Sequence, residues 1–267
     1  LTTIKVIQTF HGHGFNSKFF MLAVRWFMLK INATNIFVSH AQHESYLSRF
    51  KIKDKRNLVI YNSIDFSKFH QATNSNIRKE LCIESNMLLL GSVGNFTNGR
   101  DQLVICKFLE LLQKKGIPFY HVFVGAKSNA EPDLYKQCVA FCQKNNLRKN
   151  VFFLGSRNDV PEILGQLDAF VYSTIHDTFG IAVIEAIASE TPVFVNDWEV
   201  MKEITENGKY GNIYHSKNEH DLMHHFMEFL SNRKEYKLKA IHASTYVHTK
   251  FGIENHIADL TNVYKAL

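Results

Sequence analysis

The chain has 267 residues, of which 45% are hydrophobic and 21% are charged, a balance that is typical of a globular protein and excludes a disordered one. The formal net charge is +6, and the front of the chain is basic because its first acidic residue is Glu44. A phosphate-bearing ligand, an anionic membrane face and simple solvated charge would each account for this basic front.

Short β-branched or aromatic runs alternate with longer helical patterns along the chain. The expected strands are residues 4–10, 35–40, 57–63, 87–94, 119–125, 150–156, 168–174 and 192–196. The expected helices run to about residue 31 and then cover residues 41–50, 101–115, 132–146, 160–166 and 178–189. Continuously apolar strands that alternate with helices are typical of parallel sheets covered on both faces. The sequence therefore predicts an α/β protein.

The most apolar window is residues 17–31, SKFFMLAVRWFMLKI. Arg25 interrupts it, and it is shorter than the roughly 20 residues that span a bilayer, so we expect no transmembrane helix. Two interpretations stay open: a buried core helix, or a helix that lies on a membrane face with Trp26 and flanking lysines as anchors. The strand-like opening LTTIKVIQTF predicts no signal peptide.

A polar segment separates the early strands from the later ones. Residues 65–80, DFSKFHQATNSNIRKE, lack apolar periodicity, which predicts a domain boundary near residue 75. The first domain, residues 1–75, has too few strands to cover a parallel sheet, so we expect that its first strands are missing. We expect a second domain at residues 76–250 and, at residues 251–267, a terminal helix that returns toward the first domain.

The cysteines indicate the redox environment. Cys82, Cys106, Cys138 and Cys142 form no Cys-x-x-Cys pair and no spacing that is typical of a zinc site or a disulfide framework. Cys138 and Cys142 lie one helical turn apart, so we expect both to pack in a core. A reducing cytoplasm is the expected location.

Two acidic residues follow the strand expected at 168–174. The segment HDTFGIAVIEAIASETPV, residues 176–193, places Asp177 shortly before a glycine and Glu185 eight residues further on. Ligands of open parallel sheets bind at the carboxyl ends of the strands, where the next helix presents free N–H groups. On one helix the two acids would lie on the order of 10 Å apart along the axis and face one groove. A nucleotide sugar, with its sugar, diphosphate and ribose in a row, would meet both.

A purely structural explanation is stronger for Asp177 than for Glu185. Asp177 would serve as a plain N-cap, while residues 178–180 would open the helix and offer their N–H groups to a phosphate. Glu185 lies between Ile184 and Ala186, and an unpaired carboxylate in such surroundings costs several kcal/mol. Glu185 therefore needs a partner or a ligand.

The run D-T-F-G-I-A-V-I-E-A, followed by T-P-V, resembles the acid-x7-acid signature of the family 4 retaining glycosyltransferases of GT-B fold. Further segments resemble that family in the same order: VIQTFHGHGF, VSHAQHESYL, VIYNSIDFSKF, LLLGSVGNFTNGRDQL and NVFFLGSRNDVPEIL. The resemblance extends over nearly the whole chain. It implies two Rossmann-like domains, of which the N-terminal one lacks its first strands and its Gly-rich loop.

The resemblance implies a role for each residue of a donor site. Asp177 takes the place of the acid that touches the donor sugar, although the family usually has Glu, and Glu185 that of the acid that holds the ribose. Arg100 and Asn95 fall on the two basic positions that grip the diphosphate, and Asn95 lacks the charge. His11 falls on the histidine beside the donor sugar. Catalytic roles are thus expected for His11, Asp177 and Arg100.

Other positions follow from the same resemblance. The expected donor-binding residues also include Arg157, Thr178, Phe179, Gly180 and Ile181. Arg157 falls where backbone groups usually meet the nucleotide base. Glu203 closes a segment in which residues 197–200, Asp-Trp-Glu-Val, replace the family's glycines. His13 is a less favoured neighbour of the donor sugar, and a metal role for it and His11 lacks further ligands.

The resemblance implies transfer of a sugar from a nucleoside-diphosphate donor to a saccharide or lipid-linked acceptor, with retention, in cell-surface polysaccharide synthesis. The chain contains no Asp-x-Asp pair of the kind that holds a divalent ion against a diphosphate, so we expect metal-independent chemistry without a cofactor. A leaving phosphate oxygen would act as the base. We expect a cytoplasmic protein that contacts the inner face of the membrane, and no nucleic-acid partner.

Two other classes of protein share parts of this pattern. Residues 12–17, GHGFNS, follow a strand and are loosely similar to the G-x-G-x-x-G of dinucleotide oxidoreductases. That motif needs an acid about 20 residues further on, and none occurs before Glu44, which disfavours this class. A non-catalytic nucleotide-sugar-binding or partner-binding protein of the same fold is the open alternative, because Asn95, Asp177 and residues 197–201 depart from the family's pattern.

Overall fold

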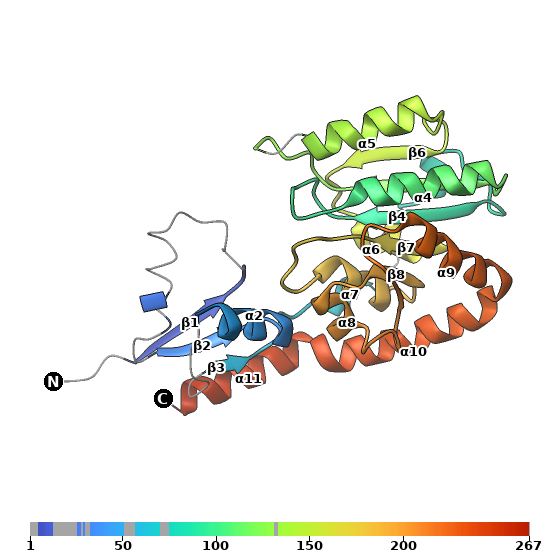
Figure 1. The fold of residues 1–267 in the computed structure, drawn as a ribbon. Coiled ribbons are helices and arrows are strands. Elements are labelled where there is room, and N and C mark those ends of the chain that lie inside the picture. Colours follow the sequence, from blue (N-terminus) through green and yellow to red (C-terminus); the bar gives the residue numbers. More distant parts are fainter. Residues whose placement is uncertain are drawn as a thin grey trace.

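The computed structural model describes residues 5–12, 26–27, 29, 33–50, 57–69, 75–130 and 133–266. Within these residues the chain forms two sheets, one of three strands and one of six, and every pair of neighbouring strands is parallel (Figure 1). Helices cover the sheets. The α/β class predicted from the sequence is confirmed.

The strands are β1 (Val6–Phe10), β2 (Ala33–Phe37), β3 (Asn57–Val59), β4 (Leu88–Val93), β5 (Phe119–Val124), β6 (Val151–Gly155), β7 (Ala169–Tyr172), β8 (Val193–Asn196) and β9 (Asn212–Tyr214). The helices are α2 (His40–Phe50), α3 (Ile77–Glu80), α4 (Gln102–Lys114), α5 (Asp133–Lys144), α6 (Val160–Gly165), α7 (Ile181–Ala188), α8 (Glu199–Ile204), α9 (Glu219–Ser231), α10 (Arg233–Phe251) and α11 (Ile253–Lys265), with a 3-10 helix η1 (Phe66–Phe69). Each strand predicted from the sequence overlaps an observed one. The sequence analysis did not anticipate β9 or the separate helices α8, α9 and α10.

The small sheet has the strand order β1-β2-β3. Its core is aromatic, because Phe37 of β2 stacks on Phe10 and packs against Tyr46 of α2. Tyr46 is fully buried, and its hydroxyl donates to the carbonyl oxygen of Gly12 at 2.8 Å. The loop after β1 is thereby tied to α2.

The large sheet has the strand order β6-β5-β4-β7-β8-β9. Every residue of β7 and β8 is buried, which explains why these strands are continuously apolar in the sequence. One face packs on α4, α5 and α9, and the other on α6, α7 and α10 (Figure 1).

The chain reverses direction across the large sheet at β4. It runs outward from β4 through β5 to β6, and then returns to the other side of β4 to build β7, β8 and β9. The loops that follow β4 and β7 therefore diverge at the carboxyl edge of the sheet. Such a switch point is where open α/β sheets bind their ligands.

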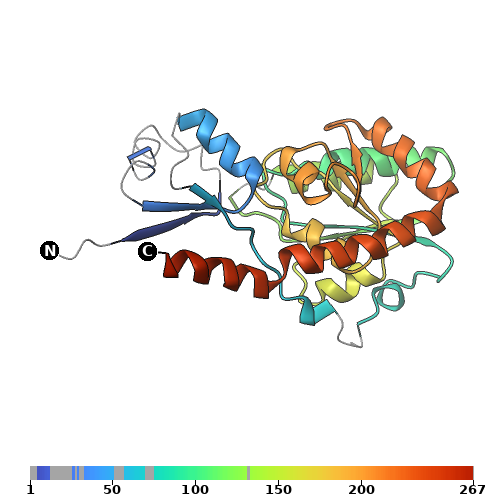
Figure 2. The same ribbon diagram turned by 90° about the horizontal axis from the view of Figure 1, so that it is seen from below.

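Helix α10 lies along the large sheet, and after a bend at Gly252 the chain continues as α11 beside the small sheet (Figures 1 and 2). Ile64 forms an isolated parallel bridge with Gly252, and the His256 ring Nδ1 lies 2.7 Å from the carbonyl oxygen of Tyr61. The C-terminal segment thus connects the two sheets.

The apolar window at residues 17–31 lies largely outside the described residues. Trp26 and Phe27 are helical and exposed, whereas Leu29 is buried. Over the part of the chain that the structure describes, no helix combines the length and the apolar character that crossing a bilayer needs.

The cysteines are free thiols. Cys106, Cys138 and Cys142 are buried and Cys82 is exposed, which confirms the prediction that Cys138 and Cys142 pack in a core.

Candidate functional site

A cavity of about 550 Å³ opens at the carboxyl edge of the large sheet, between the loops after β4 and β7 and the loop after β1. Every residue that the sequence assigned to catalysis or donor binding lines this cavity: His11, Asn95, Arg100, Arg157, Asp177, Thr178, Phe179, Gly180, Ile181 and Glu185. Residues far apart in the sequence thus meet where the sheet topology predicts a ligand. We call this space the donor cavity, after the nucleotide-sugar donor that the sequence resemblance leads us to expect there.

The helix beside the cavity begins later than the sequence predicted. It was expected at residues 178–189, but α7 begins at Ile181, with Gly180 as its N-cap in the left-handed region at φ 79°. A Cβ atom at this glycine would lie 2.6 Å from the Met201 Cε atom, so a larger residue meets both backbone strain and a close contact. The alternative of Asp177 as a plain helix N-cap is therefore wrong.

Because Asp177 precedes the helix, helical geometry does not relate it to Glu185. The expected separation of the two acids along one helix axis is wrong for this reason. Both acids nevertheless line the donor cavity, because the turn of residues 177–180 brings the Asp177 side chain to the same edge of the sheet.

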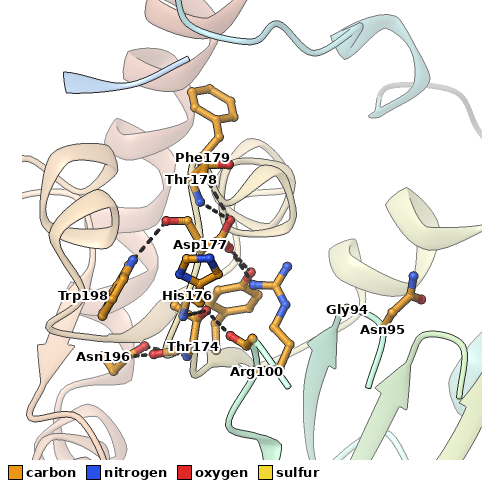
Figure 3. A network of polar contacts seen from close by, with 12 residues as sticks. Gly94, Asn95, Arg100, Thr174, His176, Asp177, Thr178, Phe179, Asn196 and Trp198 are labelled. Atoms are coloured by element: carbon orange, nitrogen blue, oxygen red, sulfur yellow. Dashed lines mark hydrogen bonds and ion pairs between the residues drawn. The ribbon is translucent and has the colours of Figure 1, made fainter. Parts of the chain in front are cut away.

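The Asp177 carboxylate is surrounded by donors (Figure 3). Its Oδ2 accepts from Arg100 Nη1 at 2.6 Å and from the Tyr172 hydroxyl at 2.5 Å. Its Oδ1 accepts from the backbone N–H groups of Thr178 at 2.8 Å and Phe179 at 3.3 Å. The side chains of Arg100 and Asp177 are only 23% and 12% exposed, so solvent screens this ion pair less than a surface pair.

Arg100 is held close to Asp177 by its backbone and by an aromatic ring. Residue 100 forms an isolated antiparallel bridge with Thr174, and the Gly99 carbonyl oxygen accepts from the Thr174 hydroxyl at 2.8 Å. The guanidinium carbon lies 4.7 Å from the centre of the Tyr172 ring, a cation–π distance. The loops after β4 and β7 are thereby joined at the base of the cavity.

The turn of residues 177–180 is also tied to its surroundings from two other directions. The Trp198 indole Nε1 donates to the carbonyl oxygen of Asp177 at 3.0 Å (Figure 3). Across the gap to the small sheet, the Ser39 hydroxyl donates to the carbonyl oxygen of Thr178 at 2.7 Å, and the Thr178 hydroxyl donates to that of His11 at 3.0 Å. The backbone that carries Asp177 is therefore fixed by both sheets.

Glu185 differs from Asp177 in having no protein partner. Among the described residues, no hydrogen bond or ion pair engages its carboxylate, and burial raises the pKa of Glu185 to about 7. Glu185 also lines a second cavity of about 600 Å³ that adjoins the first along α7. A half-buried acid without a protein partner at this junction is suited to accept hydrogen bonds from a ligand's hydroxyls.

Two of the expected donor-binding side chains are engaged by the protein itself. Asn95 Oδ1 accepts from the backbone N–H of Ala126 at 2.8 Å, so the side chain orders the loop after β5. Arg157 forms paired hydrogen bonds with Glu80, at 2.9 Å each, and with Asp159, at 2.8 Å each. These two acids raise the pKa of Arg157, and they neutralise its charge at the cavity wall.

The resemblance drew attention to Glu203 and residues 197–200, but none of these lines the donor cavity. The Glu203 carboxylate instead accepts from the backbone N–H groups of His40 and Ala41, at 2.8 Å each, and so caps the first turn of α2. His13 lies outside the described residues. Within the described residues, no group of three or more His, Cys, Asp or Glu side chains could hold a metal ion.

The sequence analysis missed the supporting residues Tyr172, Trp198 and Ser39. Tyr172 lies in an apolar strand, where a tyrosine is an ordinary core residue. Trp198 lies in a segment that the sequence flagged only for its missing glycines. No spacing rule could connect Ser39 to Thr178, because the contact exists only once the two sheets are packed.

Comparisons with known proteins agree with this fold. Residues 73–244 match the family model described as glycosyl transferases group 1. A crystal structure of Anabaena Alr3699/HepE in complex with UDP and glucose superposes with a TM-score of 0.89 at 18% identity, covering 98% of this chain and 71% of that one. A glycosyltransferase from Rickettsia africae superposes with a TM-score of 0.85 at 19% identity, covering 97% and 70%. The expected GT-B-like fold is confirmed.

Two curated relatives are similar in sequence. The UDP-Gal:alpha-D-GlcNAc-diphosphoundecaprenol alpha-1,3-galactosyltransferase of Escherichia coli is 25% identical over 209 residues, 72% of this chain and 51% of that protein. The O-antigen chain mannosyltransferase RfbU of Salmonella typhimurium is 28% identical over 188 residues, 68% of this chain and 48% of that protein. The chain thus spans about half the length of these relatives. Because the family model matches well over half of its residues, the chain belongs to the glycosyl transferases group 1 family.

Proposed function

We propose that the protein transfers a sugar from a nucleoside-diphosphate donor to a saccharide or lipid-linked acceptor in the synthesis of a cell-surface polysaccharide. The observation that carries this proposal is the meeting of Asp177, Glu185 and Arg100 on one cavity at the switch point of the large sheet. The similar E. coli protein is named for UDP-Gal and a diphosphoundecaprenol-linked acceptor, and the similar Salmonella protein for the O-antigen chain.

Along the donor cavity, the resemblance to the family implies an order for the parts of the donor. Asp177 and His11 would contact the sugar, Arg100 the diphosphate, and Glu185 the ribose hydroxyls. Arg157 is held by Glu80 and Asp159, so the base would meet the backbone near Ser156 and Arg157 rather than a free cation.

Departure of the nucleoside diphosphate leaves negative charge on the phosphate and positive, oxocarbenium-like character on the sugar. Arg100 and the N–H groups at the start of α7 are suited to the phosphate, and each such donor contributes a few kcal/mol in a site that excludes water. We propose family 4 chemistry with retention and without a metal ion, in which a leaving phosphate oxygen accepts the acceptor's proton. His11 would orient the sugar.

A release assay tests this function. The protein is incubated with UDP- and GDP-sugars and an acceptor panel, and released nucleotide is measured for the wild type and for Asp177→Ala. Glu199→Gln is the matched control, because Glu199 is an exposed acid outside the donor cavity. We expect release to fall about a hundredfold or more in Asp177→Ala, which is the order of magnitude for loss of one catalytic contact. Release by the control should stay unchanged.

Two outcomes would contradict transfer. Tight nucleotide-sugar binding without release in the wild type would favour the non-catalytic alternative. Release that Asp177→Ala leaves unchanged would show that the chemistry lies elsewhere.

We also propose that the basic front of the chain brings the protein to an anionic membrane face, where a lipid-linked acceptor resides. Residues 1–43 contain Lys5, Lys18, Arg25 and Lys30 but no acidic residue, so no negative side chain in that segment offsets their charge. Sedimentation with anionic and neutral vesicles, in low and high salt, tests this: we expect binding to anionic vesicles that high salt weakens. Absence of binding at either salt would remove the proposal.

A further inference from the structure

The Asp177 carboxylate has no acceptor site left for a sugar hydroxyl. A carboxylate offers about four lone-pair positions, two on each oxygen. Arg100 and Tyr172 occupy those of Oδ2, and the N–H groups of Thr178 and Phe179 occupy those of Oδ1. A sugar can therefore hydrogen bond to this acid only if one of the four donors leaves.

Only one of these donors is free to leave. The two N–H groups belong to a turn that Trp198 and Ser39 hold in place. Tyr172 is 3% exposed, and its ring packs in the core on Phe170. Arg100 has a long side chain at the cavity wall, where its guanidinium can turn without disturbing the core.

A diphosphate is the ligand group that would draw Arg100 away. It carries more negative charge than a single carboxylate and presents several oxygens to the planar guanidinium. When Arg100 turns to it, Asp177 Oδ2 keeps the Tyr172 hydroxyl and gains one open acceptor position. When no diphosphate is bound, the Tyr172 ring lies within cation–π distance of the Arg100 guanidinium and favours its return to Asp177.

We propose that the Arg100–Asp177 ion pair couples the diphosphate and sugar subsites, and that Tyr172 is the positioning residue that holds Asp177 once Arg100 has turned to the diphosphate. This rests on the proposed function, because it assigns the two subsites to the parts of a nucleotide-sugar donor. A sugar then finds its acceptor on Asp177 only when a diphosphate is bound beside it. Free sugars are thereby discriminated against.

Titration calorimetry with UDP and with GDP tests the coupling. Asp177→Asn frees Arg100 from its ion pair, so we expect it to bind the nucleoside diphosphate about three- to tenfold more tightly than the wild type. Loss of a repulsive charge near the phosphate would also raise affinity, so the same change is made in an Arg100→Gln background. Coupling through Arg100 predicts that the gain disappears there.

Kinetics with the best UDP- or GDP-sugar test the role of Tyr172. Removing one charge-assisted hydrogen bond in Tyr172→Phe is expected to lower kcat about tenfold, with UDP or GDP affinity changed less than twofold. Tyr214→Phe is the matched control, because Tyr214 is equally buried in the same sheet and its hydroxyl donates to the Tyr172 carbonyl oxygen instead of Asp177. We expect the control to leave kcat within twofold of the wild type, and thermal melting verifies that all variants fold.

The outcomes separate this inference from the proposed function. If the wild type binds neither UDP nor GDP, the proposed function fails and the coupling fails with it. If it binds one of them, but Asp177→Asn binds no more tightly, or its gain persists without Arg100, the coupling alone is overturned. A kcat for Tyr172→Phe equal to that of Tyr214→Phe removes the positioning role.

Discussion

At the scale of the residue, the two acids of the donor cavity have the same chemical group but different hydrogen-bonding surroundings. At least four protein donors hold Asp177, whereas Glu185 has no partner among the described residues. Burial without a partner disfavours the charged form of a carboxyl group, and this applies to Glu185. Glu185 therefore makes the nucleotide-free protein sensitive to pH.

We predict that Glu185→Gln removes this pH dependence. Burial raises the pKa of Glu185 from 4.5 to about 7, so the folded protein holds this proton more tightly than the unfolded chain. Stability of the wild type relative to the variant falls as pH rises from about 4.5 to 7, and the loss levels off above pH 7 at about 2 to 3 kcal/mol. Urea unfolding of both proteins at pH 5 and pH 8 measures it.

Glu190→Gln serves as the control, because Glu190 is an exposed acid just beyond the other end of α7. Its stability should follow the wild type at both pH values. A stability difference between the wild type and Glu185→Gln that is the same at pH 5 and pH 8 would show that Glu185 is ionised throughout.

At the scale of the element, the start of α7 sets the shape of the donor cavity. Gly180 takes a left-handed conformation and passes close to Met201 of α8, which turns the chain from the Asp177 loop into the helix. Because residues 177–180 stay outside the helix, the N–H groups of Thr178 and Phe179 point to the Asp177 carboxylate instead of to a ligand.

We predict that Gly180→Ala destabilises the protein by about 1 to 3 kcal/mol, because it adds left-handed strain and a Cβ contact at 2.6 Å. Gly116→Ala is the matched control: Gly116 has φ 69°, and a Cβ there meets no atom within 4 Å. It should show the backbone strain alone, about 1 kcal/mol. Urea unfolding gives both values, and nucleotide binding should weaken only in Gly180→Ala. Equal costs for the two changes would show that Met201 moves aside freely.

At the scale of the whole molecule, a few polar contacts hold the small sheet against the large one. Glu203 of α8 caps the N-terminus of α2, and the Tyr61 hydroxyl, whose pKa is raised by burial and by Glu203, belongs to the same junction. On the other side, the His256 ring meets the Tyr61 backbone. Together with the hydrogen bond from Thr178 to His11, these contacts hold the loop after β1 beside the donor cavity.

We predict that Glu203→Ala loosens this junction without affecting the large sheet. Two charge-assisted hydrogen bonds to the first turn of α2 are lost, at a cost of about 1 to 2 kcal/mol. Hydrogen exchange should rise about tenfold or more at the His40 and Ala41 amides and stay unchanged in β7 and β8. Glu199→Ala, on the same helix and exposed, is the control. Unchanged protection at these amides would show that Glu203 is not needed to hold α2.

Much of the large sheet could be predicted, because its signals are local. The strands are continuously apolar and the helices between them amphipathic, so the boundaries of α4 and α5 differ from prediction by one or two residues. The start of α7 was misplaced for a physical reason. Gly180 takes a left-handed conformation where a side chain would meet Met201, and the N–H groups of residues 178–179 bond to Asp177 instead of continuing the helix.

The candidate site was largely predictable as a set of residues, and much less so as a set of contacts. Asp177 and Glu185 stand out from the residues around them, because one precedes a glycine turn and the other lies in an apolar run, whereas Arg100 was indicated by the family resemblance. The pairing of Arg100 with Asp177 and Tyr172 left no trace in the sequence, because a basic residue 77 positions away becomes a neighbour only when β4 and β7 pair. The resemblance drew attention to Glu203 as well, yet its carboxylate caps α2.

By itself, the sequence determined the α/β class and the order of most elements, because apolar periodicity and turn residues act over a few positions. Its resemblance to a known family indicated which residues surround the donor cavity. Only the tertiary structure decided how those residues are used: which acid is paired, which is buried alone, and which one joins the two sheets. Hydrogen bonds and burial depend on distances between segments far apart in the chain, and those distances exist only after the sheets have formed and packed.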